Sequence, residues 1–195
     1  MKHAVILGHP NPHSFNATIA HTFCDALHHR GHVADLRDLY GMKFDPLMQV
    51  QELPDDKAFG PAPEVVAERA RLHDVDAFTF IYPLWFNAPP AIIKGYVERV
   101  FGMGFGYGPR KQGANPPLLV GRKLLSITTS GAPAEWLKAQ ESWAAIRTLA
   151  DKHVADVCGL TVLDHLHFGG IHPGIRADFV ERCRSQVSEA VARLF

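Results

Sequence analysis

Short apolar runs alternate along the chain with longer segments in which apolar residues recur every three or four positions. Runs of the first kind are typical of buried β-strands, and segments of the second kind are typical of amphipathic helices. The predicted strands cover residues 3–7, 32–39, 76–82, 122–129 and 160–166, of which residues 32–39 are predicted from the alternation of apolar and polar residues. The predicted helices cover residues 15–27, 64–73, 89–101, 143–157 and 179–194. Residues 40–63 and 102–121 are rich in glycine and proline and predict loops.

The order of these elements predicts the fold class. Five strands that alternate with helices predict an α/β three-layer sandwich, because the five-stranded parallel sheet needs crossover helices on both of its faces. A length of 195 residues without repeats or a linker fits one domain over residues 1–195. In such sheets ligands bind beyond the carboxyl ends of the strands. We therefore expect the functional residues in the segments after Leu7, Tyr82 and Thr129.

Charge and composition exclude several classes of protein. Lys and Arg total 20 and Asp and Glu total 20, so nucleic-acid binding has no electrostatic support. No apolar run approaches the roughly 20 residues that a transmembrane helix needs, and Gly8 and Pro10 interrupt the opening strand too soon for a signal peptide. Three scattered cysteines favour a reducing compartment. We expect a cytoplasmic protein with no transmembrane segment and no nucleic-acid partner.

The segment after the first strand is Gly8-His9-Pro10-Asn11-Pro12-His13-Ser14-Phe15-Asn16. It matches neither the GxGxxG nor the GxxxxGK[ST] phosphate-binding pattern. Asn11 or Ser14 could cap the helix that follows. The N–H groups at that helix start, with His9, His13 and Ser14 beside them, favour an anion site. The alternative is a capped turn with incidental histidines.

The segments after the third and fourth strands are also candidate ligand loops. Trp85 and Phe86 lie in a proline-rich run, which predicts a rigid loop facing a planar ligand, although two core aromatics are the alternative. Thr128-Thr129-Ser130-Gly131 offers hydroxyl and amide donors. It is not the G-x-S-x-G elbow of a serine hydrolase, because Thr128 stands where the first glycine would be.

A metal site is the competing interpretation of the histidines. His165 and His167 occupy alternate positions of a predicted strand and could share a face, and His172 follows nearby. No carboxylate or cysteine completes a tetrahedral pattern at a familiar spacing, so we expect no metal. A second group, His28, His29 and His32, is expected to interact with the negative end of its helix.

Taken together, the loops resemble those of one family. Gly8–Asn16, Tyr82–Phe101, Gly104–Tyr107 and Leu124–Gly131 are similar, in the same order, to segments of the NAD(P)H:quinone oxidoreductases. These are DT-diaphorase-like flavoproteins of flavodoxin-like fold. The Pro-Leu-Trp-Phe run is the most specific of these motifs. The similarity extends to about Gly174 and indicates a short bacterial-type member.

This resemblance implies an NAD(P)H-dependent flavoprotein that transfers two electrons to a quinone by a ping-pong mechanism. The first loop favours FAD, with FMN as the second choice. The family forms homodimers with the active site at the subunit junction, where Tyr107 matches an aromatic that covers the partner's substrate. The residues implicated in flavin binding come from all three loops: His9, His13, Ser14, Phe15, Asn16, Pro83, Leu84, Trp85, Phe86, Thr128, Thr129, Ser130 and Gly131.

The sequence departs from the animal members of the family behind the third loop. Their tyrosine and histidine, thought to stabilise the reduced flavin, align with Trp136 and Ser142. Trp136 remains a possible flavin donor beside the N–H groups of Ser130 and Gly131, but the proton relay of the animal enzymes is not expected here. Two alternative functions stay open: an ancillary flavin-binding subunit of a potassium-efflux system, and a reductase of azo or nitro compounds.

Overall fold

The computed structural model describes residues 1–54, 59–139 and 141–195. Its centre is a five-stranded parallel sheet in the order β2-β1-β3-β4-β5. The strands are β1 (Lys2–Leu7), β2 (Val33–Asp38), β3 (Ala77–Pro83), β4 (Lys123–Thr129) and β5 (Thr161–Phe168). All five were predicted, and the all-parallel α/β sandwich is confirmed.

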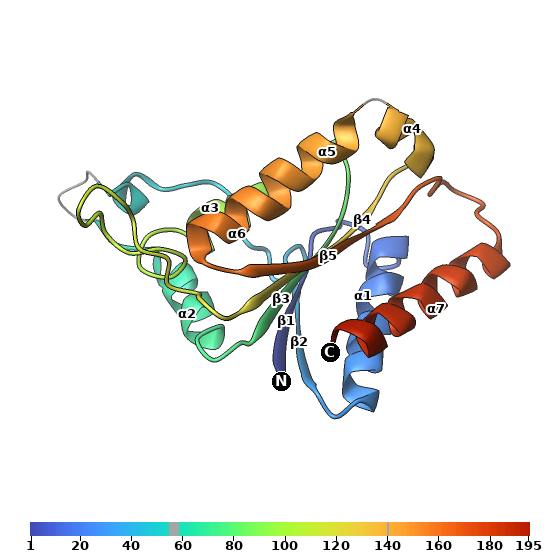
Figure 1. Ribbon diagram of the computed structural model, residues 1–195, viewed down its shortest axis with the longest axis horizontal. Coiled ribbons are helices and arrows are strands. Elements are labelled where there is room, and N and C mark those ends of the chain that lie inside the picture. The colour runs from blue at the N-terminus through green and yellow to red at the C-terminus, as the bar shows by residue number, and fades with distance from the viewer. Residues whose placement is uncertain (55–58, 140) are drawn as a thin grey trace.

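Helices cover both faces of this sheet (Figure 1). The helical segments are α1 (Phe15–His29), η1 (Val50–Glu52), α2 (Pro63–Arg71), α3 (Ala91–Val100), α4 (Ala134–Ala139), α5 (Ser142–Ile146), η2 (Arg147–Lys152), α6 (His153–Cys158) and α7 (Ala177–Leu194). Helices α1 and α7 lie side by side on one face, and α2, α3 and the α5–α6 segment lie on the other.

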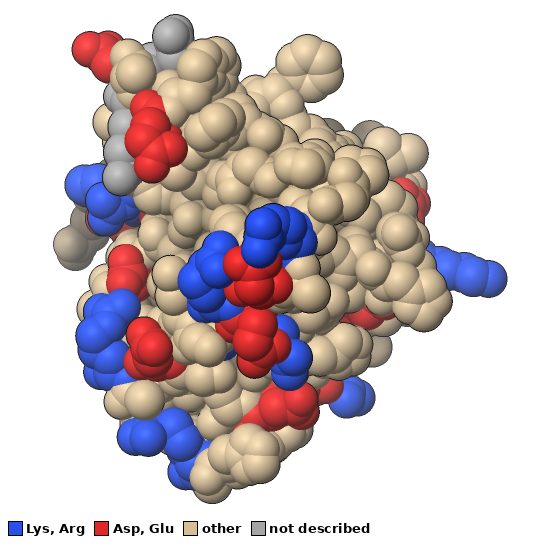
Figure 2. All heavy atoms as spheres, turned by 90° about the vertical axis from the view of Figure 1, so that its right-hand side faces the viewer, with Lys and Arg blue, Asp and Glu red and all other residues tan. Residues whose placement is uncertain are grey.

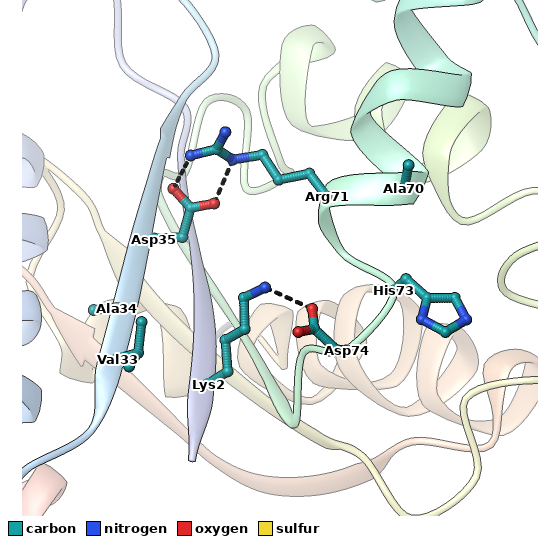
Figure 3. Close-up of a pocket in the computed structure, with 8 residues that line it drawn as sticks. All are labelled: Lys2, Val33, Ala34, Asp35, Ala70, Arg71, His73 and Asp74. Carbon is teal, nitrogen blue, oxygen red and sulfur yellow. Dashed lines mark hydrogen bonds and ion pairs between the residues drawn. The ribbon is translucent and has the colours of Figure 1, made fainter.

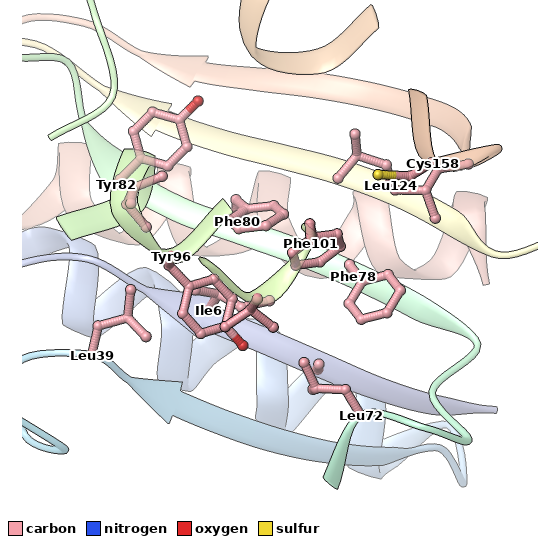
Figure 4. Packing of buried hydrophobic residues seen from close by; sticks show 14 of the residues in the cluster. Ile6, Leu39, Leu72, Phe78, Phe80, Tyr82, Tyr96, Phe101, Leu124 and Cys158 are labelled. Atoms are coloured by element: carbon pink, nitrogen blue, oxygen red, sulfur yellow. The ribbon is translucent and has the colours of Figure 1, made fainter. Parts of the chain in front are cut away.

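The central strands β1, β3 and β4 are buried on both faces, so each face of the sheet has its own apolar cluster. Val5 and Leu7 of β1 point toward α1 and α7, while the alternate residue Ile6 points toward α3. On the α3 face, Tyr96 and Phe101 pack against Phe80 and its neighbours (Figure 4). Burial of this apolar surface on both sides holds the strands, and therefore the loops at their ends, in fixed positions.

For the helix over residues 143–157, the prediction of which residues face the sheet is wrong. Leu149, expected to be buried, is 70% exposed, whereas Asp151 is 2% exposed. The cause is the π-helical turn η2, whose wider winding puts the inward positions at Ile146 and Asp151, five residues apart. Helix α4 was not predicted, because six residues are too short to show an amphipathic repeat.

The predicted loop at 40–63 is fastened to the core by one buried arginine. Arg99 of α3 donates from Nε to Glu52 Oε2 at 2.8 Å and from Nη2 to Glu64 Oε1 at 2.6 Å. The same guanidinium also donates to the carbonyl of Asp45 at 2.5 Å. Asp55 and Asp56, which helped to predict this loop, lie outside the described residues.

Charges of both signs intermingle on the surface formed by α1 and α7 (Figure 2). Arg176 and Arg182 both pair with Asp178 at the start of α7, and Arg184 pairs with Glu181. The surface therefore carries no broad field of one sign on this face. In the described part of the chain no helix is both long and apolar enough to cross a membrane.

Candidate functional site

The three candidate loops meet at the carboxyl edge of the sheet. In the sheet, Leu7 of β1 pairs with Ile81 of β3, and Ile81 pairs with Ile127 of β4, so the three strands end side by side. Leu84 N donates to Thr129 O at 2.7 Å, which joins the second loop to the third. The position expected from the topology is therefore the place where these loops come together.

The first loop is shaped by its own side chains. Ser14 is the N-cap of α1, and its Oγ accepts from Ala17 N at 3.1 Å. Asn11, the other cap candidate, instead accepts from His13 N through Oδ1 at 2.9 Å. His9 Nδ1 accepts from Asn11 N at 3.0 Å, and burial lowers the pKa of His9. The loop thus presents a neutral imidazole and a well-formed helix N-terminus, which attracts anions.

Asn16, in the first turn of α1, has a buried polar group that the described residues do not satisfy. Its side chain is 3% exposed, and Oδ1 accepts from Thr129 Oγ1 at 3.1 Å. Its Nδ2 is buried without a hydrogen-bond acceptor among the described residues. A buried unpaired donor costs about 1–3 kcal/mol. A ligand oxygen placed between the first and third loops would remove that cost.

The second loop exposes its aromatic side chains while using its amides internally. Trp85 N donates to Ala88 O and Ala88 N to Trp85 O, each at 3.1 Å. With Leu84 N bonded to Thr129 O, the amides of Leu84 and Trp85 are both paired within the protein. Phe86 has φ +52°, a left-handed backbone, and its side chain is fully exposed. A ligand here would meet aromatic surface first.

The third loop divides its side chains among different neighbours. Thr129 bonds Asn16, as described above, and Ser130 N donates to Phe168 O at 3.0 Å. Ser130 Oγ lies 2.7 Å from Ala132 O, its acceptor, and 3.0 Å from His167 Nε2. Thr128 is completely buried and faces two histidines of β5. Its hydroxyl therefore belongs to the interior of the protein.

A continuous line of hydrogen bonds leads inward from Ser130. His167 Nδ1 lies 2.9 Å from Thr128 Oγ1, and Thr128 Oγ1 lies 2.7 Å from His165 Nε2. His165 Nδ1 lies 2.6 Å from Asp151 Oδ2, and Asp151 Oδ1 accepts from Ser126 Oγ at 2.6 Å. We call Ser130, His167, Thr128, His165 and Asp151 the histidine chain.

The sequence located only part of the histidine chain. The alternation on a strand correctly put His165 and His167 on one face, but Thr128 bridges them and no metal is required to explain them. Within the described ranges no three His, Cys, Asp or Glu side chains are grouped to hold a metal ion. Asp151 was missed, because a polar residue inside an amphipathic helix pattern is expected to face solvent.

The remaining predicted residues lie outside the three loops. Tyr107 forms bridges to Met103 and Pro117 and lines a hollow of about 570 Å³ between α3 and the α5–α6 segment, which Ala88 and Pro89 of the second loop also line. Trp136 is half-exposed on α4. Ser142 Oγ accepts from Asn87 Nδ2 at 3.4 Å, so it contacts the second loop.

Another hollow lies at the opposite, amino edge of the sheet and does not have the character of a site. Its volume is about 840 Å³. Lys2 pairs with Asp74, and Arg71 pairs with Asp35 through both carboxylate oxygens (Figure 3). The charges along this hollow thus satisfy one another, whereas the carboxyl edge holds an unpaired donor.

Comparisons with known proteins agree with this geometry. The profile of a family described as having a flavodoxin-like fold matches residues 1–191. The chain belongs to the flavodoxin-like family. Among its members, an uncharacterised NAD(P)H oxidoreductase of Haemophilus influenzae is 30% identical over 174 residues, which are 88% of this chain and 85% of the relative. The predicted resemblance to the NAD(P)H:quinone oxidoreductases is confirmed.

Two further flavodoxin-like relatives show the extent of the match. NAD(P)H dehydrogenase [quinone] 1 of Cavia porcellus is 33% identical over 145 residues, which are 66% of this chain and 53% of that protein. The chain thus spans about half the length of this animal relative. The structure of the NAD(P)H:quinone oxidoreductase of Methanothermobacter marburgensis superposes with a TM-score of 0.85 at 24% identity, covering 100% of this chain and 99% of that one.

Proposed function

We propose that this protein binds a flavin nucleotide where the three loops meet and transfers two electrons from NAD(P)H to a quinone. The observation that carries the proposal is the buried Asn16 Nδ2, which lacks a protein acceptor in the described structure. The phosphate and ring carbonyl oxygens of a flavin nucleotide are acceptors that fit it. The names of the relatives, which include quinone dehydrogenases, supply the class of reaction.

The three loops would divide the work of binding. The start of α1, with His13, Ser14 and Phe15, holds the phosphate groups. Trp85 and Phe86 lie along the ring system, and the prolines around them keep that loop rigid. When bound, a flavin accepts a hydride from NAD(P)H and passes two electrons to an acceptor. The protein's part is to orient the ring and to place the N–H group of Gly131 at its polar edge, because the N–H group of Ser130 is already bonded to Phe168 O.

The nucleotide we expect is FAD, on the resemblance of the first loop, with FMN as the competing form. Neighbouring structures that contain FMN are 17% and 20% identical, a level that supports the fold alone. NADH and NADPH are both kept as donors. The three cysteines are buried and unpaired, which is in line with the proposed cytoplasmic location.

The active unit we propose is a homodimer. Phe86 is fully exposed in a left-handed conformation, and Trp85, Trp136 and Leu149 are exposed as well. Exposed aromatic groups of this size are typical of interfaces. From the family resemblance, we expect the partner subunit's Tyr107 to cover the substrate. A subunit junction would therefore complete the site.

Flavin titration tests the site. We expect the purified protein to bind FAD or FMN, and quenching of flavin fluorescence measures this binding. Asn16→Asp should weaken the affinity at least about tenfold, because it replaces a hydrogen-bond donor with a negative charge. Gln186→Glu makes the same chemical change on the exposed face of α7 and should leave the affinity unchanged. A protein that binds neither nucleotide would contradict the proposal.

Steady-state kinetics on the same preparation test the reaction. We expect parallel lines in double-reciprocal plots of NAD(P)H oxidation against quinone, because both substrates use one ring in turn. Intersecting lines would contradict ping-pong order. Faster turnover with an azo dye or a nitroaromatic would reassign the acceptor. Flavin binding with negligible NAD(P)H oxidation would favour the ancillary potassium-efflux subunit.

A further inference from the structure

The histidine chain has two ends and a protected middle. Ser130 lies at the third loop, and Asp151 lies in the interior beside Ser126. Every member is buried except His167, which is half-buried. Each histidine bonds a chain neighbour through both ring nitrogens. Protons can therefore move along this line from one group to the next without passing through solvent.

Several elements fix the geometry of the chain. The register of β4 and β5 sets Ser126 beside His165 and Thr128 beside His167, on one face of the sheet. The indole of Trp143 covers both imidazoles, with ring centroids 4.6 and 5.3 Å away. The π turn brings the fifth member, Asp151, to the sheet. π turns inside helices occur frequently at functional sites.

The histidine chain has two arrangements in which every member is hydrogen-bonded, and these arrangements differ by one proton. In the first, Ser130 donates to His167 Nε2, His167 Nδ1–H to Thr128, Thr128 to His165 Nε2, and His165 Nδ1–H to an ionised Asp151. In the second, His165 carries protons on both nitrogens and donates to Asp151 and Thr128, Thr128 donates to His167 Nδ1, and His167 Nε2–H donates to Ser130. Ser130 then donates to Ala132 O, at the observed 2.7 Å.

Other titratable groups surround the buried pair of His165 and Asp151. From β3, Tyr82 contacts Ser126, and burial together with the charge of Asp151 raises its pKa well above the ordinary value. On β5, Asp164 Oδ1 accepts from His165 N at 2.8 Å, and Arg193 of α7 neutralises its other oxygen at 2.7 Å. Arg147 of η2 also acts on Asp164, and His153 of α6 lines the same hollow as Tyr82.

We propose that the His165–Asp151 pair holds one proton and delivers it through Thr128, His167 and Ser130 to the ligand site. The proposal rests on the proposed function, in which NAD(P)H and a quinone yield NAD(P)⁺ and a hydroquinone. NAD(P)H supplies a hydride, that is, two electrons and one proton, and the reaction consumes one further proton. When the histidine chain returns from the second arrangement to the first, Ser130 releases one proton. Every member of the histidine chain still has a hydrogen-bond partner afterwards. The four interior members are positioning residues for that transfer.

The proton itself can be observed without flavin. In the protein labelled with ¹⁵N-histidine and free of flavin, we expect NMR to show a form of His165 that is protonated on both ring nitrogens. Asp151→Asn keeps the size of the side chain but removes the counter-charge, so the doubly protonated form should be lost at the same pH. Asp156→Asn, on exposed α6, should change nothing. Identical His165 signals in the parent protein and Asp151→Asn would overturn the proposal.

Delivery is tested in the flavin-loaded protein by stopped flow. We expect Asp151→Asn to slow the quinone half-reaction on the order of 100-fold, the usual size of a general-acid contribution, and to slow reduction by NAD(P)H far less. Thr128→Val should slow the quinone step while His165 remains protonated in the NMR experiment. Parent rates for the quinone step in both variants would overturn delivery. If the parent protein binds no flavin, the proposed function fails, and the NMR result still decides whether the pair holds a proton.

Discussion

The two faces of the sheet each bury a histidine, and they provide it with opposite surroundings. His3, on the face of α1 and α7, has no hydrogen-bond partner for either ring nitrogen in the described structure. Its neighbours are the rings of Phe195 and His32, with centroids 4.5 and 5.2 Å away. His165, on the α3 face, bonds Thr128 and Asp151. Burial alone therefore does not define the role of a histidine, because the partners decide which protonation state it can hold.

The largest loss of stability should follow from removing the carboxylate that bonds His165 on the α3 face. Asp151→Ala leaves His165 and Ser126 without their acceptor, and loss of one partner from a buried pair costs about 3–5 kcal/mol in the free energy of unfolding. Urea unfolding measures this loss. Asp156→Ala removes an exposed ion pair on α6 and should change stability by less than about 0.5 kcal/mol. Equal effects of the two substitutions would contradict the importance of the buried pair.

On the face of α1 and α7, where His3 lies against the rings of Phe195 and His32, the contribution of the histidine to stability depends on pH. Burial, and after it the charge of His32, lowers the pKa of His3 from 6.5 to about 4. The unfolded chain therefore binds a proton first as the pH falls, so this contribution to stability is complete above 6.5 and is lost between 6.5 and about 4. The loss should approach about 3 kcal/mol.

The variant that isolates this contribution is His3→Phe, which keeps a ring against Phe195. Its stability should fall less steeply than that of the parent protein when urea midpoints are compared at neutral and at acidic pH. Parallel pH profiles for the two proteins would show that His3 titrates normally.

The smallest change in stability is expected from substituting two buried threonines on neighbouring strands. Thr79 of β3 and Thr128 of β4 are both completely buried, but only Thr128 has side-chain partners in the described structure. Thr128→Val should cost about 1–3 kcal/mol because two imidazoles lose a partner, whereas Thr79→Val should be neutral or slightly stabilising. Calorimetric melting of the two variants provides the comparison. A larger loss of stability for Thr79→Val than for Thr128→Val would contradict this prediction.

The sequence predicted what depends on local pattern and on topology. All five strands were predicted, the strand over residues 32–39 from the alternation of apolar and polar residues and the others chiefly from short apolar runs. The meeting of the three loops followed from the rule for parallel sheets. Asp151 was beyond such reasoning, since its inward position requires the π turn and partners from two strands. The unpaired amide of Asn16 was likewise visible only once Thr129 occupied its oxygen.

The extra residue wound into η2 carries a consequence for comparing this protein with its relatives. An ordinary helix turns about 100° per residue, so a one-residue deletion between Ile146 and Ala155 would swing the carboxylate of Asp151 out toward water while the flanking turns stay packed. A single-position gap in that stretch of a relative therefore marks the loss of the inward acid. Where a relative has such a gap, its sequence alone would identify a protein without the inward acid.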